Sequence, residues 1–251
     1  MTDTPELVIQ ERRGNVLLLA LNRPERHHAL SQALSDTLAS ALETAEQDAS
    51  IAAVILTGTG EKAFCAGGDM LEMSGVVEQS QRTSGAGGLF GVLSKMSVPV
   101  IAAINGYCFG GGARLAIGCD IRMASENATF RLPGSEYGLV VAAATLPRLV
   151  GAERAKELIF TARKFTAQEA AQYGLVTSLH TQADLLPAAW EMGETIAGYS
   201  AGAVREAKRV IDAATLSVEA SKMEDDANRR LRGSDEQVSR FRDATRRVTG
   251  R

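Results

Sequence analysis

Apolar positions near the start of the chain change from a strand pattern to a helical pattern. Apolar runs at Leu7–Ile9 and Val16–Leu21 flank a polar turn, and this arrangement predicts a β-hairpin. Leu30–Ala49 then carries leucines at helical spacing, which predicts an amphipathic helix. Ser31 or Ser35 is suited to cap its N-terminus, because a serine hydroxyl accepts hydrogen bonds from free backbone N–H groups there.

The strand and helix patterns then alternate along the chain. Short apolar runs typical of buried strands lie at Ala52–Thr57, Val100–Ile104, Ile121–Ala124 and, more weakly, Ala128–Phe130. Glycines 110–112 open a predicted helix that runs through Gly118, and a later helix begins near Gly151. The alternation predicts an α/β fold.

The C-terminal part of the chain has a different pattern. Strand patterns stop at about Leu185, and stretches rich in Ala, Glu and Arg follow with breaks near Gly198, Thr215 and Gly233. We therefore expect an α/β body over residues 1–190 and a helical segment over residues 191–251. The Ser-, Gln- and Gly-rich stretch Ser74–Gly91 predicts a mobile loop or a broken helix.

Composition excludes several classes of protein. The chain has 251 residues, 45% hydrophobic and 23% charged, which is typical of a folded domain rather than a disordered one. A formal net charge of −3 gives no reason to expect nucleic acid or a membrane as partner. No secretory signal or membrane-spanning run is present, and the three cysteines lack metal-ligand spacing. We expect a cytoplasmic protein with reduced thiols and no metal site.

Two glycine-rich segments, Lys62–Asp69 and Asn105–Arg114, suggest chemistry. Each follows a predicted buried strand and opens a helix, where backbone N–H groups lack partners and the helix dipole is positive. Two such N–H groups that point at one atom would bind an anion or a carbonyl oxygen. Ordinary tight turns are the alternative, and neither segment matches the dinucleotide or P-loop phosphate motifs.

The same segments resemble the ordered signatures of the enoyl-CoA hydratase/isomerase (crotonase) family. The similar stretches are Asn22–Pro24 with Ala29–Leu30, Ala63–Asp69, Ala103–Tyr107 with Gly110–Gly112, Ala116–Asp120, Phe130–Pro133 and Arg148–Gly151. The resemblance implies a crotonase-like spiral of ββα units with a C-terminal α-helical trimerisation segment. It also implies an acyl-CoA thioester as substrate, with coenzyme A as part of that substrate and no separate cofactor. The expected assembly is a homotrimer or a dimer of trimers.

The family's site residues can be carried over by position. The resemblance implies that the Ala66 and Gly111 N–H groups bind the thioester carbonyl oxygen. It places Ala66, Gly67, Gly68 and Asp69 along the acyl-thioester site, and Arg26, His28 and Ala29 along the coenzyme A wall. From the residues alone, Arg26 and His28 would belong to a solvated turn, Asp69 would cap a helix, and Cys65 and Cys108 would pack in the core.

The chain departs from the family where a hydratase carries its two catalytic glutamates. Those positions hold Arg114 and Gly134, and the aspartate of the related dienoyl-CoA isomerases would fall near Ala142. Arginine cannot act as a base near neutral pH, and glycine contributes only backbone. The departure therefore argues against ordinary hydration by a glutamate pair.

Glu136 is the candidate replacement for the missing base. If Pro133–Tyr137 is extended, residues 134 and 136 project to the same side, and Glu136 enters the site as a general acid/base. A surface glutamate is the alternative. Arg114 has two interpretations, a salt bridge to Glu136 or recognition of a substrate carboxylate or bicarbonate.

The sequence therefore predicts an acyl-CoA enzyme of the hydratase/isomerase class, a lyase or isomerase in fatty-acid or related acyl-CoA breakdown. It would stabilise a thioester enolate through backbone N–H groups. Two alternatives stay open at this stage. One is decarboxylation or other C–C bond chemistry on a carboxylated acyl-CoA, and the other is a non-catalytic acyl-CoA-binding protein.

Overall fold

A six-stranded sheet forms the base of the computed structural model, which describes residues 6–74 and 88–250. Its strands lie in the order β1 (Val8–Arg13), β2 (Val16–Leu21), β3 (Ala53–Gly58), β5 (Val100–Ile104), β7 (Ile121–Ser125) and β10 (Ser178–His180). β1 and β2 pair antiparallel, which confirms the predicted hairpin, and the remaining pairs are parallel.

A second sheet has four short strands. They are β4 (Ala63–Cys65), β6 (Tyr107–Phe109), β8 (Thr129–Arg131) and β9 (Phe165–Thr166). Strands that follow one another in sequence alternate between the sheets. In β3 and β4, in β5 and β6, and in β7 and β8, the first strand lies in the large sheet and the second in the small sheet. Helix α2 (Met70–Met73) follows β4, and α4 (Gly111–Gly118) follows β6. This is the predicted spiral of ββα units, and the fold class is confirmed.

The inner strands β2, β3, β5 and β7 of the large sheet are buried on both faces, which explains their largely apolar sequences, whereas β1 at one edge is mostly exposed. Along β3, Val54 and Leu56 face a core that also contains α1 (Gln32–Gln47), α3 (Leu89–Leu93) and α4. Ala53 and Ile55 face the other way, against a cluster that includes Trp190 of α8 (Gln182–Ala197). Ser31 caps α1 by accepting a hydrogen bond from the Leu34 N–H, as the sequence predicted.

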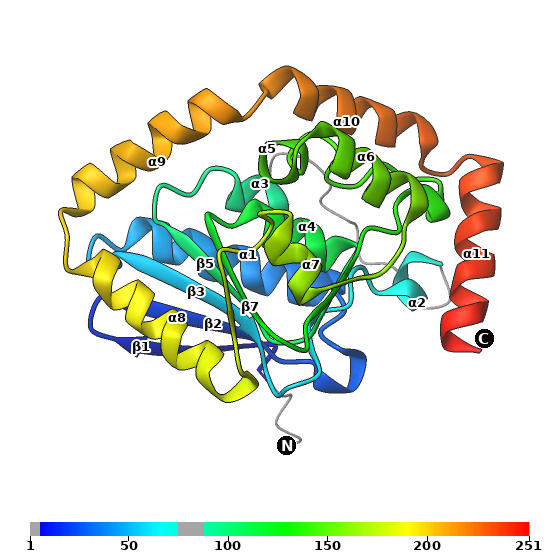
Figure 1. Cartoon of the computed structure of the whole chain (residues 1–251). Helices are drawn as coiled ribbons and strands as arrows, with labels where there is room; N and C mark the ends of the chain where they lie inside the picture. Colours follow the sequence, from blue (N-terminus) through cyan, green and yellow to red (C-terminus); the bar gives the residue numbers. More distant parts are fainter. Residues whose placement is uncertain (1–5, 75–87, 251) are drawn as a thin grey trace.

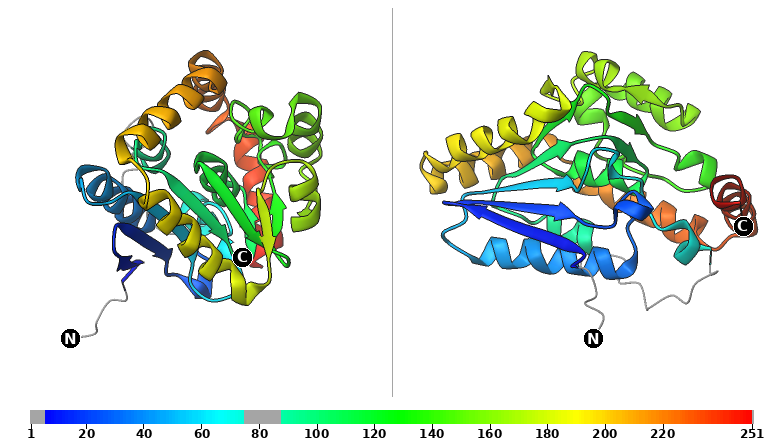
Figure 2. Two further views of the ribbon diagram at one scale, coloured as in Figure 1. Left: turned by 60° about the vertical axis from the view of Figure 1, so that its left-hand side comes forward. Right: turned by 90° about the horizontal axis from the view of Figure 1, so that it is seen from below.

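Three helices leave the body and form an arch around it. They are α9 (Ala201–Thr215), α10 (Val218–Leu231) and α11 (Asp235–Thr249), and the breaks between them lie near the predicted positions. Figure 1 shows the arch passing over the body, and Figure 2 shows it from two other sides. The boundary predicted after residue 190 falls inside α8, which packs on the large sheet. The arch therefore begins at Ala201.

The arch is fastened to a segment of the body, residues 140–144. The Glu224 carboxylate of α10 accepts the Ala142 N–H at 3.0 Å and the Ala144 N–H at 2.8 Å. Asn228, one turn later, accepts the Val140 N–H at 2.9 Å. Glu224 is 7% exposed, and these backbone bonds offset the cost of burying its carboxylate. Hydrogen bonds from this segment to α10 thus fix the position of residues 140–144, which follow Gly134 in sequence.

Shorter elements connect these parts. They are η1 (Pro24–Arg26), η2 (Ser135–Tyr137), α5 (Pro147–Val150), α6 (Ala152–Thr161) and α7 (Ala167–Gln172). The predicted loop or broken helix at Ser74–Gly91 lies largely outside the described residues, because the description omits residues 75–87. Of the helices in the described ranges, none combines the length and the apolar character that crossing a bilayer requires.

Candidate functional site

Parallel pairing of β4 with β6 brings the two glycine-rich segments together. Ala63 lies opposite Tyr107, and Cys65 lies opposite Cys108. Because the strands are parallel, the chain leaves both at the same edge of the small sheet. A Cβ on Gly112 would overlap the Cys65 carbonyl oxygen, so a glycine is required where α4 meets β4. We call Gly67, Gly68, Gly110 and Gly111 the glycine junction.

Two backbone N–H groups lie side by side at this junction. A Cβ on Gly111 would lie 3.3 Å from the Gly68 nitrogen, and a Cβ on Gly67 would lie 3.3 Å from the Gly111 nitrogen. Within the described residues, neither the Gly68 N–H nor the Gly111 N–H donates to an acceptor. Gly111 is the first residue of α4, where the helix dipole is positive. Together the two donors can bind one carbonyl oxygen or anion.

The structure corrects the assignment of Ala66 as a donor to substrate. The Ala66 N–H donates to the His27 carbonyl oxygen at 2.9 Å, so it is already used inside the protein. Gly67 has a φ of 107°, a conformation open to glycine, and the Gly68 N–H that follows is the free one. Nothing in the sequence separates position 66 from position 68, since both lie beside the same glycine.

The predicted coenzyme A wall runs along this glycine segment. The Leu30 N–H donates to the Gly67 carbonyl oxygen at 2.7 Å, and the Asp69 N–H donates to the Leu30 carbonyl oxygen at 3.1 Å. Arg26 is exposed and Ala29 is half-buried on the chain leading into this contact. The structure thus brings the predicted wall residues beside residues 66–69, although the two stretches are distant in sequence.

His28 is an exception among the wall residues, because its ring is buried inside the protein. The side chain is 1% exposed, and its Nδ1 accepts the Arg23 N–H at 3.0 Å. A backbone N–H can only donate, so the ring proton lies on Nε2, which donates to the Thr59 carbonyl oxygen at 2.9 Å. Burial lowers the pKa of the imidazole. Both nitrogens are occupied, so the predicted contact of this side chain with substrate is replaced by a structural role.

Asp69 and the buried cysteines also have structural surroundings. Asp69 caps α2 by accepting the Leu71 N–H at 3.1 Å, and it pairs with Arg23 at 3.1 Å. Cys65 and Cys108 are fully buried, and burial raises the pKa of the Cys65 thiol to about 12. The capping and packing interpretations of these three residues are therefore confirmed.

Arg114 lies one turn into α4 from Gly111, on the side of the helix that faces α3. Its guanidinium carbon lies 4.4 Å from the centre of the Phe90 ring. Among the residues that the structure describes, no carboxylate lies within 4.0 Å of Arg114, so the predicted salt bridge to Glu136 is absent. The side chain is half-buried and stacked.

Glu136 is bound elsewhere. One carboxylate oxygen accepts from Arg131, and the other accepts from Arg247 of α11 at 3.0 Å. Residues 135–137 form the 3-10 helix η2, so the extended backbone assumed for Pro133–Tyr137 is wrong. Strand alternation therefore does not apply here, and the prediction that it would bring Glu136 into the site is wrong. Glu136 instead links the segment after β8 to α11.

Gly134, where the resemblance places a hydratase glutamate, offers no room for a larger side chain. It has helical backbone angles, and a Cβ would lie 2.8 Å from the Leu139 carbonyl oxygen and 2.9 Å from a Val141 methyl carbon. Real Cβ atoms do not approach neighbours so closely. The segment held by Glu224 and Asn228 thus occupies part of the space that a side chain at 134 would need.

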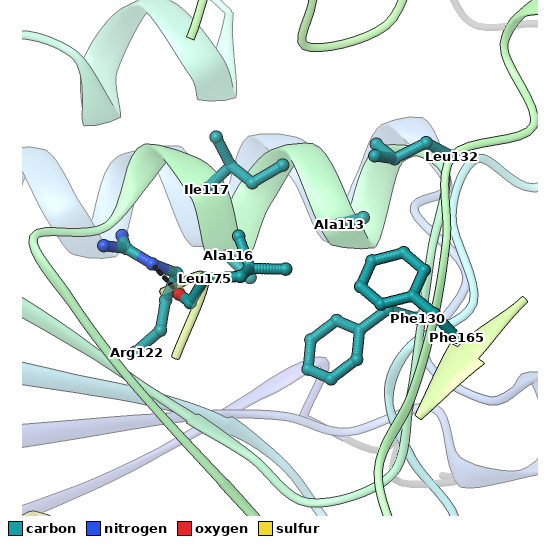
Figure 3. Close-up of a pocket in the computed structure, with 8 residues that line it drawn as sticks. All are labelled: Ala113, Ala116, Ile117, Arg122, Phe130, Leu132, Phe165 and Leu175. Atoms are coloured by element: carbon teal, nitrogen blue, oxygen red, sulfur yellow. Dashed lines mark hydrogen bonds between the residues drawn. The ribbon is translucent and has the colours of Figure 1, made fainter. Parts of the chain in front are cut away.

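A small cavity on another side of α4 is a packing feature rather than a substrate site. It holds about 10 Å³, roughly the space for one water molecule. Figure 3 shows it lined mainly by apolar side chains, with Arg122 at one end. The Arg122 guanidinium donates to the Leu175 carbonyl oxygen at 2.8 Å and to that of Cys119 at 2.5 Å. No group of three His, Cys, Asp or Glu side chains in the described ranges could hold a metal ion.

Comparison with known proteins places this geometry in context. Residues 11–243 match the family model described as enoyl-CoA hydratase/isomerase. A short-chain-enoyl-CoA hydratase of Clostridium acetobutylicum is 40% identical over 215 residues, which cover 82% of this chain and 80% of that protein. A mitochondrial enoyl-CoA hydratase of Pongo abelii is 40% identical over 228 residues, covering 87% and 78% of the two chains.

A solved structure shares the fold over almost the whole chain. The crystal structure of an enoyl-CoA hydratase/isomerase from Pseudoalteromonas atlantica T6c superimposes with a TM-score of 0.86 at 30% identity. The match covers 95% of this chain and 98% of that one.

The buried neutral His28 predicts a loss of stability in mild acid. Its pKa in the folded protein lies below the ordinary value of 6.5, so the unfolded chain takes up this proton first as pH falls. The free energy of unfolding should therefore decrease from pH 7.5 to pH 5.5, by at most about 1.4 kcal/mol per unit from this group. Urea unfolding of a His28→Gln variant should show a shallower pH dependence than the wild-type protein. Equal slopes for the two proteins would contradict the assignment.

A glutamate at position 134 should lower the stability of the fold, because neighbouring atoms leave no space for its side chain. Gly134→Glu should lower the free energy of unfolding by about 1–3 kcal/mol, because the new side chain must displace Leu139 and Val141. Gly202→Ala is the matched control, since a Cβ at this helical position meets nothing within 4 Å. Urea unfolding should show no loss in the control. A Gly134→Glu variant as stable as the wild-type protein would contradict the prediction, because it would mean that residues 139–141 can move aside at no cost in free energy.

Proposed function

The chain belongs to the enoyl-CoA hydratase/isomerase family, and we propose that it binds the carbonyl oxygen of an acyl-CoA thioester between the N–H groups of Gly68 and Gly111. The observation that carries the proposal is the pair of adjacent N–H groups at the glycine junction, neither of which has an acceptor among the residues that the structure describes. A buried or half-buried backbone donor ordinarily has a partner. A thioester oxygen would supply one partner to both groups.

The same pair would stabilise an enolate formed from the thioester. When electrons from the α carbon move into the carbonyl group, negative charge develops on its oxygen, and fixed N–H dipoles stabilise that charge without reorganising. Each donor of this kind contributes a factor of about 10²–10³ in rate. Ordinary hydration by two glutamates is not part of the proposal, because positions 114 and 134 hold arginine and glycine.

Two routes would supply the enolate electrons. In the first, a water molecule takes a proton from the α carbon and passes it to solvent, because Arg131 and Arg247 hold Glu136. In the second, the bond from the α carbon to a carboxylate breaks, its electron pair enters the enolate, carbon dioxide leaves, and water later returns a proton to carbon. With its carboxylate held in this way, Glu136 is not available as a base. The second route needs no protein base, and this supports it as an alternative.

The remainder of the substrate would lie along the wall next to the junction. We propose that the exposed Arg26 guanidinium meets a phosphate of coenzyme A, while the chain at Ala29 contacts the pantetheine arm. Apolar side chains on the arch are exposed, including Ile211 at 60% and Met223 at 65%. Exposure of this kind supports a homotrimer or a dimer of trimers as the assembly.

The two-donor site predicts a specific effect of a methyl group at Gly111. In heavy water the protein should place deuterium on the α carbon of an acyl-CoA, as followed by mass spectrometry. Gly111→Ala should slow this exchange by about 100-fold or more, because its Cβ sits 3.3 Å from the Gly68 nitrogen and blocks both donors.

The matched control for that experiment is Gly202→Ala, which should exchange at the wild-type rate. Exchange by Gly111→Ala at the rate of the control would remove the junction from the mechanism. Binding of acyl-CoA without any exchange in the wild-type protein would favour carbon dioxide loss or a non-catalytic binding protein.

Glu136 should prove to be a structural residue. Glu136→Gln should keep α-proton exchange within about threefold of wild type but weaken both ion pairs, each worth no more than about 1 kcal/mol at this exposure. The melting temperature should fall by roughly 2–4 °C per kcal/mol lost. Arg247→Gln, which removes one partner, should show a similar thermal effect. Loss of exchange in Glu136→Gln with an unchanged melting temperature would restore Glu136 as the acid/base.

A further inference from the structure

Arg114 differs from most of the buried and half-buried arginines in its partners. Arg23, Arg131, Arg148 and Arg163 each form an ion pair with an aspartate or glutamate. Arg114 is half-buried, yet in the described part of the chain its guanidinium contacts the Phe90 ring and no carboxylate. Within that part, Arg122 and Arg205 also lack a carboxylate partner, but they donate to carbonyl or hydroxyl oxygens. Partial burial without a counter-charge costs free energy, and an anionic ligand would offset that cost.

The helix directs this side chain toward the glycine junction. Positions 111, 114 and 118 lie on one side of α4, because spacings of three and four residues repeat once per turn. The rise from Gly111 to Arg114 is about 4.5 Å. Side chains of a helix tilt toward its N-terminus, so Arg114 leans back toward the end that carries the free Gly111 N–H.

The surroundings of Arg114 on this side are apolar. Leu93 of α3 would contact a Cβ on Gly118, and Phe90 of the same helix stacks on Arg114. At the junction itself, Leu30 lies 3.3 Å from a Cβ on Gly111. The guanidinium carbon lies over the Phe90 ring, a contact that uses no N–H group, and the N–H groups of a guanidinium match a carboxylate in bidentate fashion. Among the described residues, the Arg114 guanidinium thus lies beside apolar side chains of α3, about one helical turn from Gly111.

We propose that Arg114 recognises a carboxylate at the far end of the acyl group, so that the preferred substrates are thioesters of dicarboxylic acids. The inference rests on the proposed thioester site and adds a substrate class to it. Because this carboxylate is not attached to the α carbon, its loss would not form the thioester enolate, and the group stays on the substrate. Arg114 lies only one turn of α4 from Gly111, and this favours a short acyl chain between the thioester carbonyl and the carboxylate.

The test compares the binding of carboxylated and neutral thioesters. Dissociation constants are measured by calorimetry for succinyl-, glutaryl- and adipyl-CoA, each against the neutral straight-chain thioester with the same number of carbons. The wild-type protein should bind at least one carboxylated member about 10-fold or more tightly than its neutral counterpart. Arg114→Gln should lose this preference and keep its affinity for the neutral thioesters.

Two further variants serve as controls. Arg12→Gln removes one positive charge from the edge strand β1, where Arg12 pairs with Asp48, and should keep the wild-type preference. Arg114→Lys keeps the charge without the planar fork and should give an intermediate preference, which also covers the case that Arg114→Gln folds poorly.

The outcomes separate this inference from the function on which it rests. Equal affinity for both classes in the wild-type protein would overturn the role of Arg114, as would a preference that survives in Arg114→Gln. If neutral thioesters still undergo α-proton exchange in either case, the thioester site stands without the carboxylate receptor. Failure of every thioester to bind would overturn both proposals.

Discussion

The site depends on the parallel pairing of two three-residue strands, β4 and β6. This pairing places the chain after Cys65 against the chain after Phe109, although more than forty residues separate them. Gly112 permits the contact because any side chain there would overlap the Cys65 carbonyl oxygen. The free N–H groups of Gly68 and Gly111 are a consequence of that contact, and so is the position of Arg114 one turn further along α4.

The backbone around Gly134 leaves no space for a larger side chain. The space beside Gly134 is narrowed by Leu139 and Val141, on a segment that Glu224 and Asn228 hold from the arch. Glu136, the nearest carboxylate in sequence, is used to tie η2 to α11. The glycine junction thus lies one helical turn from Arg114, whose guanidinium contacts Phe90, and in the proposed function this combination would suit recognition of an anionic acyl group.

Much of the fold could be predicted because long apolar runs and capping residues act locally. The β1–β2 hairpin, the cap at Ser31 and the start of α4 at its glycines all follow from neighbours in sequence. Of the short strands of the second sheet, only β8 was predicted, from the weak run at Ala128–Phe130, since two or three residues carry too little pattern. Contacts between distant segments were also hidden, including the one from α10 to residues 140–144.

The errors in the predicted site have the same origin. The use of the Ala66 N–H by His27, the burial of His28 and the 3-10 turn at Glu136 each depend on a partner far away in sequence or on local backbone geometry. Arg114 and Gly134 could be identified as departures from the family by position alone. Only the structure shows that Arg114 lacks a carboxylate partner among the described residues and that Gly134 is crowded.

The central claim is that the Gly68 and Gly111 N–H groups together hold a thioester carbonyl oxygen. Difference infrared spectroscopy on an acyl-CoA with a 13C-labelled thioester carbonyl tests this most directly, because hydrogen bonds to the oxygen weaken the C=O bond. The account predicts that binding shifts the labelled stretch to lower frequency and that Gly111→Ala reverses most of this shift. A bound thioester whose stretch stays at its frequency in water, or shifts equally in the variant, would contradict it.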